Sequence, residues 1–323
     1  MRVPRAEDRV IATQPSLIAL DWGTSSLRAY LLGPDGSATV DSRTEPWGIM
    51  QIPDGDFAGA FDTVTKAWRE RWPALASIAC GMIGSNQGWV GAPYCPCPAG
   101  APELAATLVK APDAPLHVIA GVAQFGDHPD MMRGEETEIV GALALHPEFA
   151  AESLLVLPGT HSKWVRVLNG KVSSFATYMT GEVFHLLREH SILGRQSGAG
   201  RRALESAESD EAFTRGVLAA RGSSDGVAAL LFSARALVLA QRLEAAAGPD
   251  YLSGLLIGDE LRCGLMAGVN PSALVGDAGL CRRYVAALRL FGLDDTPVIN
   301  GPAARGLWQI AWRAGLTIAN STD

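Results

Sequence analysis

One arrangement of strands and turns occurs twice in this chain, about 140 residues apart, and it limits the folds that the sequence can adopt. The first copy, IALDWGTSSLRAYLL at 18–32, is an apolar strand, a turn of small and hydroxyl residues, and a second strand. A third strand is expected from GSATVDSRTEP. The second copy, at 153–179, has the same order around the turn GTHS and ends after an Asn-Gly hairpin signal. A repeated three-stranded unit predicts two related α/β lobes with a cleft between them.

The segments that follow each copy alternate between helical and strand patterns. After the first copy, apolar residues recur at helical spacing over 57–68, followed by a buried strand at 76–85, a helix at 103–109 and a strand at 116–122. The proline-rich GAPYCPCPAGAP reads as a loop. The first lobe is therefore expected to be β-β-β-α-β-α-β over residues 1–133. The second, over 134–323, is expected to repeat that core with a helical insertion at about 195–270.

Composition and charge exclude several classes of function. The net charge is −7, and no stretch concentrates Lys and Arg, so neither nucleic acid nor an anionic membrane surface is expected as a partner. No apolar run approaches the roughly 18 residues of a membrane span. The N-terminal MRVPRAEDRVIATQPS lacks the apolar core of a secretory signal. Five scattered cysteines without metal-ligand spacing favour a reducing, cytoplasmic location.

The two repeated turns carry the residue types that bind phosphate. Backbone N–H groups and hydroxyls of Gly23, Thr24 and Ser25 can surround an anion without a lysine, and the second turn offers the same groups. Asp21, at the end of the first strand, would repel a phosphate unless a cation lay between them, which suggests hydrated Mg²⁺. Two ordinary hairpin turns are the alternative interpretation.

Longer motifs resemble one family of kinases. GMIGSNQGW, APY, MRGEETEIVGA, LPGTHSKWV and YMTGEVFHLL occur in this order and are similar to 2-dehydro-3-deoxygalactonokinase, within the superfamily of sugar kinases, Hsp70 and actin. The resemblance implies two ribonuclease H-like lobes that bind ATP with Mg²⁺. It also implies ATP-dependent phosphorylation of 2-dehydro-3-deoxy-D-galactonate at its 6-hydroxyl, giving 2-dehydro-3-deoxy-6-phosphogalactonate in galactonate and galactose catabolism. The resemblance does not decide whether the protein forms a homodimer.

The resemblance also implies roles for individual residues. Asp21 to Ser25 correspond to the first phosphate motif and to the metal site. The second phosphate motif and the nucleoside motif correspond to Gly159, Thr160, His161, Ser162, Gly276, Asp277 and Ala278. Lys163 follows the second turn and is expected either to reach a phosphoryl oxygen or to face water.

Glu135 stands where related sugar kinases place the aspartate that accepts the hydroxyl proton, and Glu136 is the second candidate. The alternative for both is simple complementation of the helix dipole.

The predicted sugar-acid pocket needs hydrogen-bond donors and an apolar wall. Its candidate residues are Ser85, Asn86, Trp89, Tyr94, Thr180, Gly181 and Glu182. Helix capping or ordinary packing is the alternative for each of them.

Two further functions stay open: a kinase of the same fold with another sugar or sugar acid as substrate, and a nucleotide-binding regulator without catalysis. The absence of a basic N-terminal module and the presence of an apparent base favour a kinase.

Overall fold

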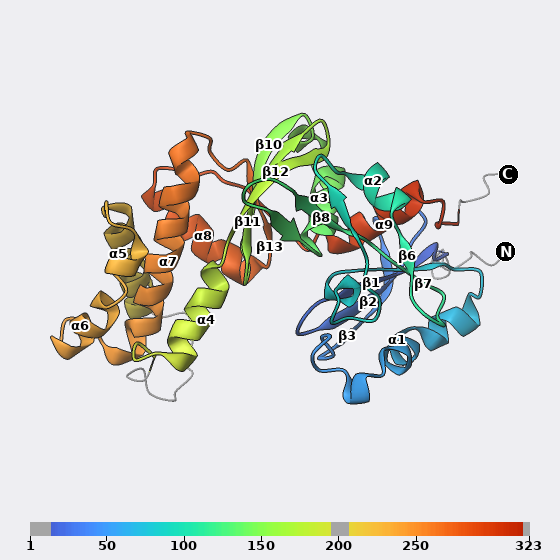
Figure 1. Cartoon of the computed structure of the whole chain (residues 1–323), viewed down its shortest axis with the longest axis horizontal. Helices are drawn as coiled ribbons and strands as arrows, with labels where there is room; N and C mark the ends of the chain where they lie inside the picture. The colour runs from blue at the N-terminus through green and yellow to red at the C-terminus, as the bar shows by residue number, and fades with distance from the viewer. Residues whose placement is uncertain (1–13, 195–206, 319–323) are drawn as a thin grey trace, which may run out of the picture. The chain divides into compact units, whose positions relative to one another are not determined.

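The computed structural model describes residues 14–194 and 207–318 as a mixed α/β protein (Figure 1). The chain divides into two compact units. Unit 1 combines Met1–Pro147 with Pro302–Asp323, and unit 2 is Glu148–Gly301. This division differs from the predicted boundary at residue 133, because the helix that follows that boundary and the last helix of the chain both belong to unit 1.

Unit 1 is built on a six-stranded sheet in the order β3-β2-β1-β4-β7-β6. Its strands are β1 (Leu17–Trp22), β2 (Leu27–Leu32), β3 (Thr39–Glu45), β4 (Ser77–Cys80), β6 (Val109–Lys110) and β7 (Leu116–Val118). β1, β2 and β3 pair antiparallel, whereas β1, β4 and β7 run parallel. Helix α1 (Phe57–Arg71) buries Phe61, Val64 and Trp68 in the core on this sheet, as the helical spacing predicts.

A smaller sheet corrects two predictions. It contains β5 (Tyr94–Pro96), β8 (Gly121–Gln124) and β9 (Asp130–Met132), with α2 (Ala101–Ala106) between the first two. β5 lies inside the segment predicted as a loop, and Pro96 is tolerated because β5 is an edge strand. The strand predicted at 116–122 is two strands in different sheets. The Ile119 N–H still donates to Ala79 O at 2.9 Å, and the chain then leaves the larger sheet.

Two helices complete unit 1 by packing backbone against backbone. They are α3 (Glu135–Leu145) and α9 (Ala303–Arg313). A Cβ on Gly141 would lie 2.0 Å from Pro302 O, and one on Gly306 would lie 1.9 Å from Thr137 O. Only glycine permits this approach. Short 3-10 turns lie at η1 (Pro53–Gly55) and η2 (Met82–Gly84) in this unit.

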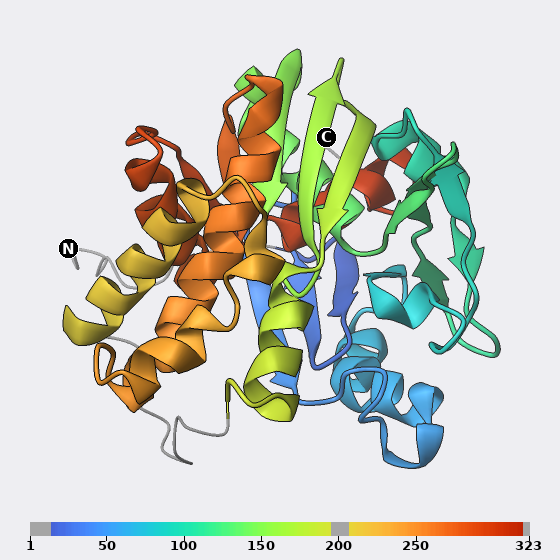
Figure 2. The ribbon, with the colours of Figure 1, turned by 60° about the vertical axis from the view of Figure 1, so that its left-hand side comes forward.

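Unit 2 contains a five-stranded sheet in the order β12-β11-β10-β13-β14 (Figure 2). Its strands are β10 (Glu152–Leu157), β11 (Ser162–Leu168), β12 (Lys171–Tyr178), β13 (Ala273–Gly276) and β14 (Val298–Asn300). The first three pair antiparallel, and β10, β13 and β14 run parallel. The order and directions match β3-β2-β1-β4-β7 of unit 1. The repeated turns therefore lie at equivalent places, between the central strand and its antiparallel neighbour.

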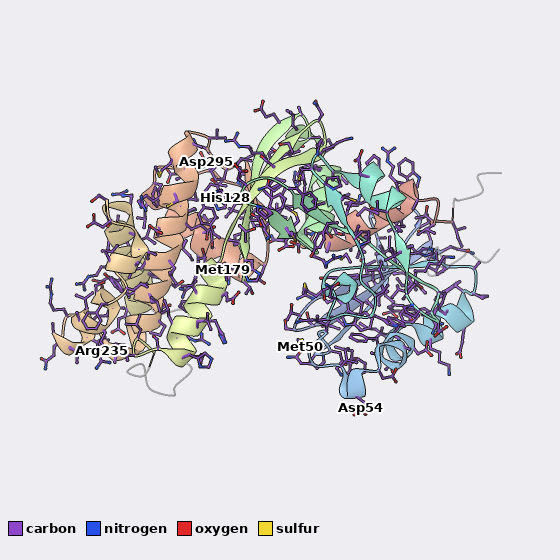
Figure 3. All side chains as sticks on the ribbon, viewed as in Figure 1. Met50, Asp54, His128, Met179, Arg235 and Asp295 are labelled. Atoms are coloured by element: carbon purple, nitrogen blue, oxygen red, sulfur yellow. The ribbon has the colours of Figure 1, made fainter. Side chains whose placement is uncertain are left out.

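The rest of unit 2 is helical. The helices are α4 (Thr180–His190), α5 (Ala207–Arg221), α6 (Ser233–Leu239), α7 (Gly248–Gly264) and α8 (Ala278–Leu290). Short 3-10 turns lie at η4 (Val227–Ala229), η5 (Ala245–Ala247) and η6 (Leu265–Ala267). A further turn, η3 (Pro147–Phe149), begins at the last residue of the first segment of unit 1. α5 and α7 lie side by side, since Gly216 and Gly254 let their backbones meet (Figure 2), and Arg235 lies on α6 (Figure 3). The predicted insertion at about 195–270 is helical where it is described; its residues 195–206 lie outside the described residues. Within 14–194 and 207–318, no helix has both the length and the apolar character needed to cross a membrane.

The contact between α3 and α9 predicts a strong local intolerance to a single methyl group. Gly306→Ala should lower the free energy of unfolding by about 1–3 kcal/mol, because its Cβ would overlap a backbone oxygen that cannot rotate away. Gly126→Ala is the matched control, since nothing lies within 4 Å of the added Cβ. Urea denaturation of both variants measures the difference, and equal midpoints would show that the two helices can separate without loss.

Candidate functional site

The first repeated turn in unit 1 is a tight, supported turn. Gly23 N–H donates to Ser26 O at 3.0 Å, and Ile49 N–H donates to Gly23 O at 3.1 Å. Gly48 packs against the Thr24 carbonyl, where a Cβ would lie 1.9 Å from the oxygen. The side chains of Thr24 and Ser25 remain exposed. The loop that follows β3 therefore fixes the backbone of the turn and leaves its hydroxyls accessible.

Asp21 lies at the end of β1 beside a single cation. Its register partner on β2 is Arg28, whose Nη1 lies 3.4 Å from Oδ2 of the aspartate. The Asp21 side chain is 23% exposed. Burial raises the pKa of Asp21, and the charge of Arg28 opposes that shift. The described residues contain no group of three or more His, Cys, Asp or Glu side chains arranged to hold a metal ion.

Two glycines bring the start of α3 against the ends of β1 and β4. Gly81 follows β4 with φ of +92°, and a Cβ there would lie 2.7 Å from Trp22 O. Gly134 precedes α3 with φ of +113°, and its Cβ would lie 3.4 Å from Gly81 Cα. Positive φ and close backbone contact both favour glycine at these positions. The acidic first turn of α3 thus lies near Asp21.

The two candidate bases have different surroundings. Glu135 is half-buried, and its Oε2 accepts the Arg133 N–H at 3.0 Å. Glu136 is only 1% exposed; its Oε2 accepts the Gly134 N–H at 2.6 Å and its Oε1 accepts the Thr137 hydroxyl at 3.0 Å. A base must reach the proton that it accepts. The geometry therefore favours Glu135 for contact with a substrate and gives Glu136 a structural role at the helix start.

Glu138 is an acid of this cluster that the sequence reasoning did not select. Burial, followed by the charges of Asp21, Glu135 and Glu136, raises its pKa to about 8, while Arg28 opposes the shift. Burial and Glu135 likewise raise the pKa of Glu136 to about 7. Residues three apart share a helix face, so the spacing of Glu135 and Glu138 was a usable signal. Glu136 and Glu138 therefore keep their protons to higher pH than ordinary glutamates.

The predicted sugar-acid residues of unit 1 do not have equal access to a ligand. Ser85 is half-buried and its Oγ accepts the Gln87 N–H at 3.3 Å, whereas Asn86 is exposed. The Trp89 ring stacks on Phe57 with centroids 6.4 Å apart and also meets Trp22 and Phe61. Trp89 is thus mainly a packing residue between the loop and α1. Asn86 is the residue of this set that is most open to a ligand.

Tyr94 is joined to the start of α3 by an arginine that the sequence reasoning missed. The guanidinium of Arg133 lies 4.3 Å from the centre of the Tyr94 ring, and its Nη2 donates to Ala92 O at 2.8 Å. Its Nε and Nη1 are buried and have no hydrogen-bond partner among the described residues. The backbone N–H of Arg133 also donates to the Glu135 carboxylate. Arg133 therefore connects the predicted sugar loop with the predicted base.

The second repeated turn in unit 2 has an exposed and a buried half. Gly159 is half-buried, and Thr160 and His161 are exposed. Ser162 is fully buried, with its Oγ 3.1 Å from Tyr284 Oη. Lys163 is 4% exposed, and its Nζ donates to Thr177 Oγ1 at 2.7 Å on the neighbouring strand. This burial contradicts the expectation that Lys163 faces water, and its expected contact with a phosphoryl oxygen stays a prediction.

The start of α4 is packed directly onto this turn. β12 passes into α4 at Met179 (Figure 3). A Cβ on Gly181 would lie 2.4 Å from Gly159 O, and the Glu182 N–H donates to Thr160 O at 2.9 Å. The Glu182 carboxylate also pairs with His161. Gly181 and Glu182 therefore lie directly against the predicted phosphate turn. Thr180 instead points to a buried glutamate, Glu260.

The predicted nucleoside motif lies beside a cavity of about 440 Å³ in unit 2. Gly276 has φ of +135°, and Asp277 caps α8 by accepting the Leu280 N–H at 2.9 Å. Of the three residues predicted at the nucleoside, Ala278 lines the cavity, whereas Gly276 and Asp277 do not. The full lining is Ala278, Arg282, Val285, Arg289, Val298 and Asn300. Apolar walls with a few convergent polar groups are typical of small-molecule sites.

Both units thus carry a hydroxyl-bearing turn at the same place in a mixed α/β sheet, and unit 1 adds an acidic cluster. This combination is typical of an enzyme that acts on a small molecule. The family model for 2-keto-3-deoxy-galactonokinase matches residues 21–310, and the chain belongs to that family.

Relatives with known names agree with this family. A Rhizobium meliloti (strain 1021) protein named "Probable 2-dehydro-3-deoxygalactonokinase" is 39% identical over 307 residues, covering 90% of this chain and 97% of its own. The 2-dehydro-3-deoxygalactonokinase of Escherichia coli (strain K12) is 36% identical over 290 residues, covering 88% and 94%. The crystal structure of a candidate 2-dehydro-3-deoxygalactonokinase from Sinorhizobium meliloti has a TM-score of 0.82 at 36% identity, covering 91% and 98%.

Ionisation of Glu138 should make the free energy of unfolding fall as pH rises. Its pKa is raised from the ordinary 4.5 to about 8 in the folded protein, so the folded state binds the proton more tightly than the unfolded state. The resulting stability is fully present below the unfolded pKa and is lost as pH rises through the folded pKa. Between about pH 5 and pH 8, the free energy of unfolding of Glu138→Gln should therefore rise relative to that of wild type by on the order of a few kcal/mol.

Urea denaturation at several pH values measures this gain. Glu70→Gln is the control, because that side chain is 67% exposed on α1. A Glu138→Gln curve that stays parallel to wild type across the pH range would contradict the assignment of a raised pKa to this acid.

Proposed function

We propose that this chain catalyses ATP-dependent phosphorylation of 2-dehydro-3-deoxy-D-galactonate at its 6-hydroxyl, giving 2-dehydro-3-deoxy-6-phosphogalactonate in galactonate breakdown. The observation that carries the proposal is membership of the 2-keto-3-deoxy-galactonokinase family over residues 21–310. The matches to two named relatives span 97% and 94% of the relatives' own length. The two hydroxyl turns and the acidic cluster supply the chemical groups that such a reaction requires.

In the proposed mechanism, unit 1 supplies the base and the metal-binding carboxylate. Glu135 accepts the proton of the 6-hydroxyl as that oxygen attacks the γ-phosphorus, and the bond from the γ-phosphorus to the bridging oxygen breaks, so that ADP leaves. Its half-buried position and its hydrogen bond from the Arg133 N–H hold the carboxylate in one orientation. Asp21 is the carboxylate suited to a hydrated Mg²⁺, which would neutralise phosphate charge when bound. Thr24 and Ser25 offer their exposed hydroxyls to the phosphates, and Gly23, whose N–H donates to Ser26 O, shapes the turn.

The sugar acid needs donors for its carboxylate and hydroxyls. In unit 1, Asn86 is exposed and Ser85 is half-buried, so both are assigned to the sugar acid. Tyr94 is also half-buried and rests on the guanidinium of Arg133. Trp89 contributes through packing, which fixes the loop that carries the other residues.

Unit 2 supplies groups for the nucleotide. The exposed Thr160 and His161, with Gly159, are assigned to the phosphates, whereas Ser162 and Lys163 support the turn from beneath. The cavity beside Ala278 is assigned to the nucleoside, with Val285 and Val298 as an apolar wall and Asn300 as a hydrogen-bonding group. Gly181 and Glu182 hold the phosphate turn. The matching strand orders support the further proposal that both units are ribonuclease H-like lobes.

Substrate identity is tested by a coupled ADP-release assay with ATP and Mg²⁺ across a panel of sugar acids. ADP formation should be fastest with 2-dehydro-3-deoxygalactonate. The 2-dehydro-3-deoxygluconate epimer is the sharpest comparison, because one inverted hydroxyl distinguishes the two compounds. ATP hydrolysis without sugar measures the background. Faster turnover of a different sugar acid would replace the proposed substrate, and no turnover with any would overturn the kinase proposal.

Replacement of the proposed base should separate Glu135 from its neighbour. Glu135→Gln keeps the size of the side chain but cannot accept the proton, so kcat should fall about 10²- to 10⁴-fold. Glu136→Gln should change kcat far less, because the Glu136 carboxylate is buried at the helix start. Steady-state kinetics with calorimetric ATP binding distinguish lost chemistry from lost binding. The opposite order of the two variants would move the role of base to Glu136.

A further inference from the structure

Glu260 is a buried carboxylate in unit 2 that none of the proposed roles uses. It lies on α7 and is 2% exposed. Its Oε1 accepts Trp164 Nε1–H at 2.9 Å, and its Oε2 accepts Tyr284 Oη–H at 2.7 Å and the Thr180 hydroxyl. A buried carboxylate is costly unless hydrogen bonds satisfy its oxygens. Here three donors converge on it, and the geometry of the carboxylate fixes the donors relative to one another.

The three donors belong to the elements that form the proposed nucleotide site. Trp164 is on β11, two residues after the phosphate turn. Thr180 begins α4, which packs onto the turn through Gly181. Tyr284 is on α8, the helix that also carries the cavity residues Ala278, Arg282 and Val285. One carboxylate therefore joins the turn, the helix packed on it and the wall of the cavity.

Tyr284 extends this network to the phosphate turn itself. Its Oη lies 3.1 Å from Ser162 Oγ, and Ser162 is the last residue of the turn. The resulting chain runs from Glu260 through Tyr284 to Ser162, and every member is buried. Ser162 is thus held from the protein side, while the neighbouring Thr160 and His161 are exposed on the other side. A shift of the Tyr284 hydroxyl would move the turn relative to α8.

We propose that Glu260 is a positioning residue for ATP, which acts through Tyr284 and Ser162 and through Thr180 to hold the phosphate turn in register with the nucleoside cavity. This inference rests on the proposed kinase function. Glu260 does not touch the nucleotide; it determines where the groups that touch it lie. Burial raises the pKa of Glu260, and the hydrogen bonds from Thr180, Tyr284 and Trp164 oppose that shift. A fixed hydrogen-bond network rigidifies the groups that it connects.

A matched pair of tyrosine variants tests the inference. Tyr284→Phe removes the hydroxyl that joins Glu260 to Ser162. Tyr251→Phe is the control: Tyr251 is also buried in unit 2, and its Oη lies 2.9 Å from Ser233 Oγ on α6. Each variant removes a buried hydroxyl bonded to a serine, but Tyr284→Phe also removes a donor to the Glu260 carboxylate, so it should lose more melting temperature than the control. Only Tyr284 connects to the phosphate turn.

The two variants should differ in their kinetics with ATP. Tyr284→Phe should lower kcat/KM for ATP about tenfold, because it removes the hydrogen bonds to Ser162 and to Glu260, and should leave KM for the sugar acid nearly unchanged. Calorimetric titration with ATP alone should show a similar weakening. Tyr251→Phe should match wild type in both measurements. Equal ATP constants for the two variants would overturn the inference and reduce the network to a core contact.

Variants along the other branch give a second, independent test. Thr180→Ser keeps the hydroxyl that donates to Glu260 and should keep wild-type affinity for ATP, whereas Thr180→Val should lose about as much as Tyr284→Phe. Equal affinities for the serine and valine variants would contradict the positioning role. The wild-type enzyme in the same assay keeps the two proposals apart. Wild-type ATP binding without sugar phosphorylation would overturn the proposed function, and the variants' ATP affinities would still decide on Glu260.

Discussion

The close approach of three backbone segments in unit 1 is the constraint on which the rest of its candidate site depends. The end of β1, the residue after β4 and the residue before α3 meet at Gly81 and Gly134, where any side chain would collide with backbone or require strained φ. This contact places the acidic first turn of α3 beside Asp21. The helix dipole favours those carboxylates, while their mutual repulsion and burial oppose ionisation. The helix dipole therefore stabilises the ionised carboxylates of this site, whereas burial and their mutual repulsion destabilise them.

Unit 2 uses the same device with different chemistry. There a glycine of α4, Gly181, lies against the carbonyl of Gly159, so a helix start again meets the turn that follows a central strand. Instead of an acidic cluster, the site has an exposed His161 paired with Glu182 and a buried network around Glu260. The same sheet order thus carries two different sets of side chains: an acidic cluster in unit 1, and a hydroxyl-bearing turn beside a buried hydrogen-bond network in unit 2.

Local patterns in the sequence predicted most strands and helices, because each depends on periodicity that neighbouring residues display. The three-stranded repeats, α1, α3 and the helical segment around α7 are of this kind. The patterns failed where distant contacts decide the outcome. The residues 116–122 divide between two sheets because β8 pairs with β5 and β9, and α9 joins unit 1 because Gly141 and Gly306 allow it to pack on α3.

The candidate site shows the same limit. Asp21 and the acids of α3 were visible as residue types at a strand end and a helix start. The buried directions of Ser162 and Lys163 and the packing of Trp89 depend on partners far along the chain. Arg133 and Glu260 were not predicted as site residues, because neither residue type at its position in the sequence indicates a chemical role. Their importance comes from what they connect.

The arrangement of unit 1 has a consequence for the order of folding during synthesis. Unit 2 is one continuous segment, Glu148–Gly301, and all its strands and helices precede α9 in the chain, so they are synthesised before it. Unit 1 needs α9, whose Leu307 is fully buried and whose Trp308 Nε1 lies 3.3 Å from Ser16 Oγ at the start of the first sheet. Domains usually fold from the N-terminus onward as the chain emerges. Here the segment of unit 1 that precedes unit 2 acquires its complete core only after unit 2 has been made, so the apolar surface that α9 covers stays open until α9 emerges.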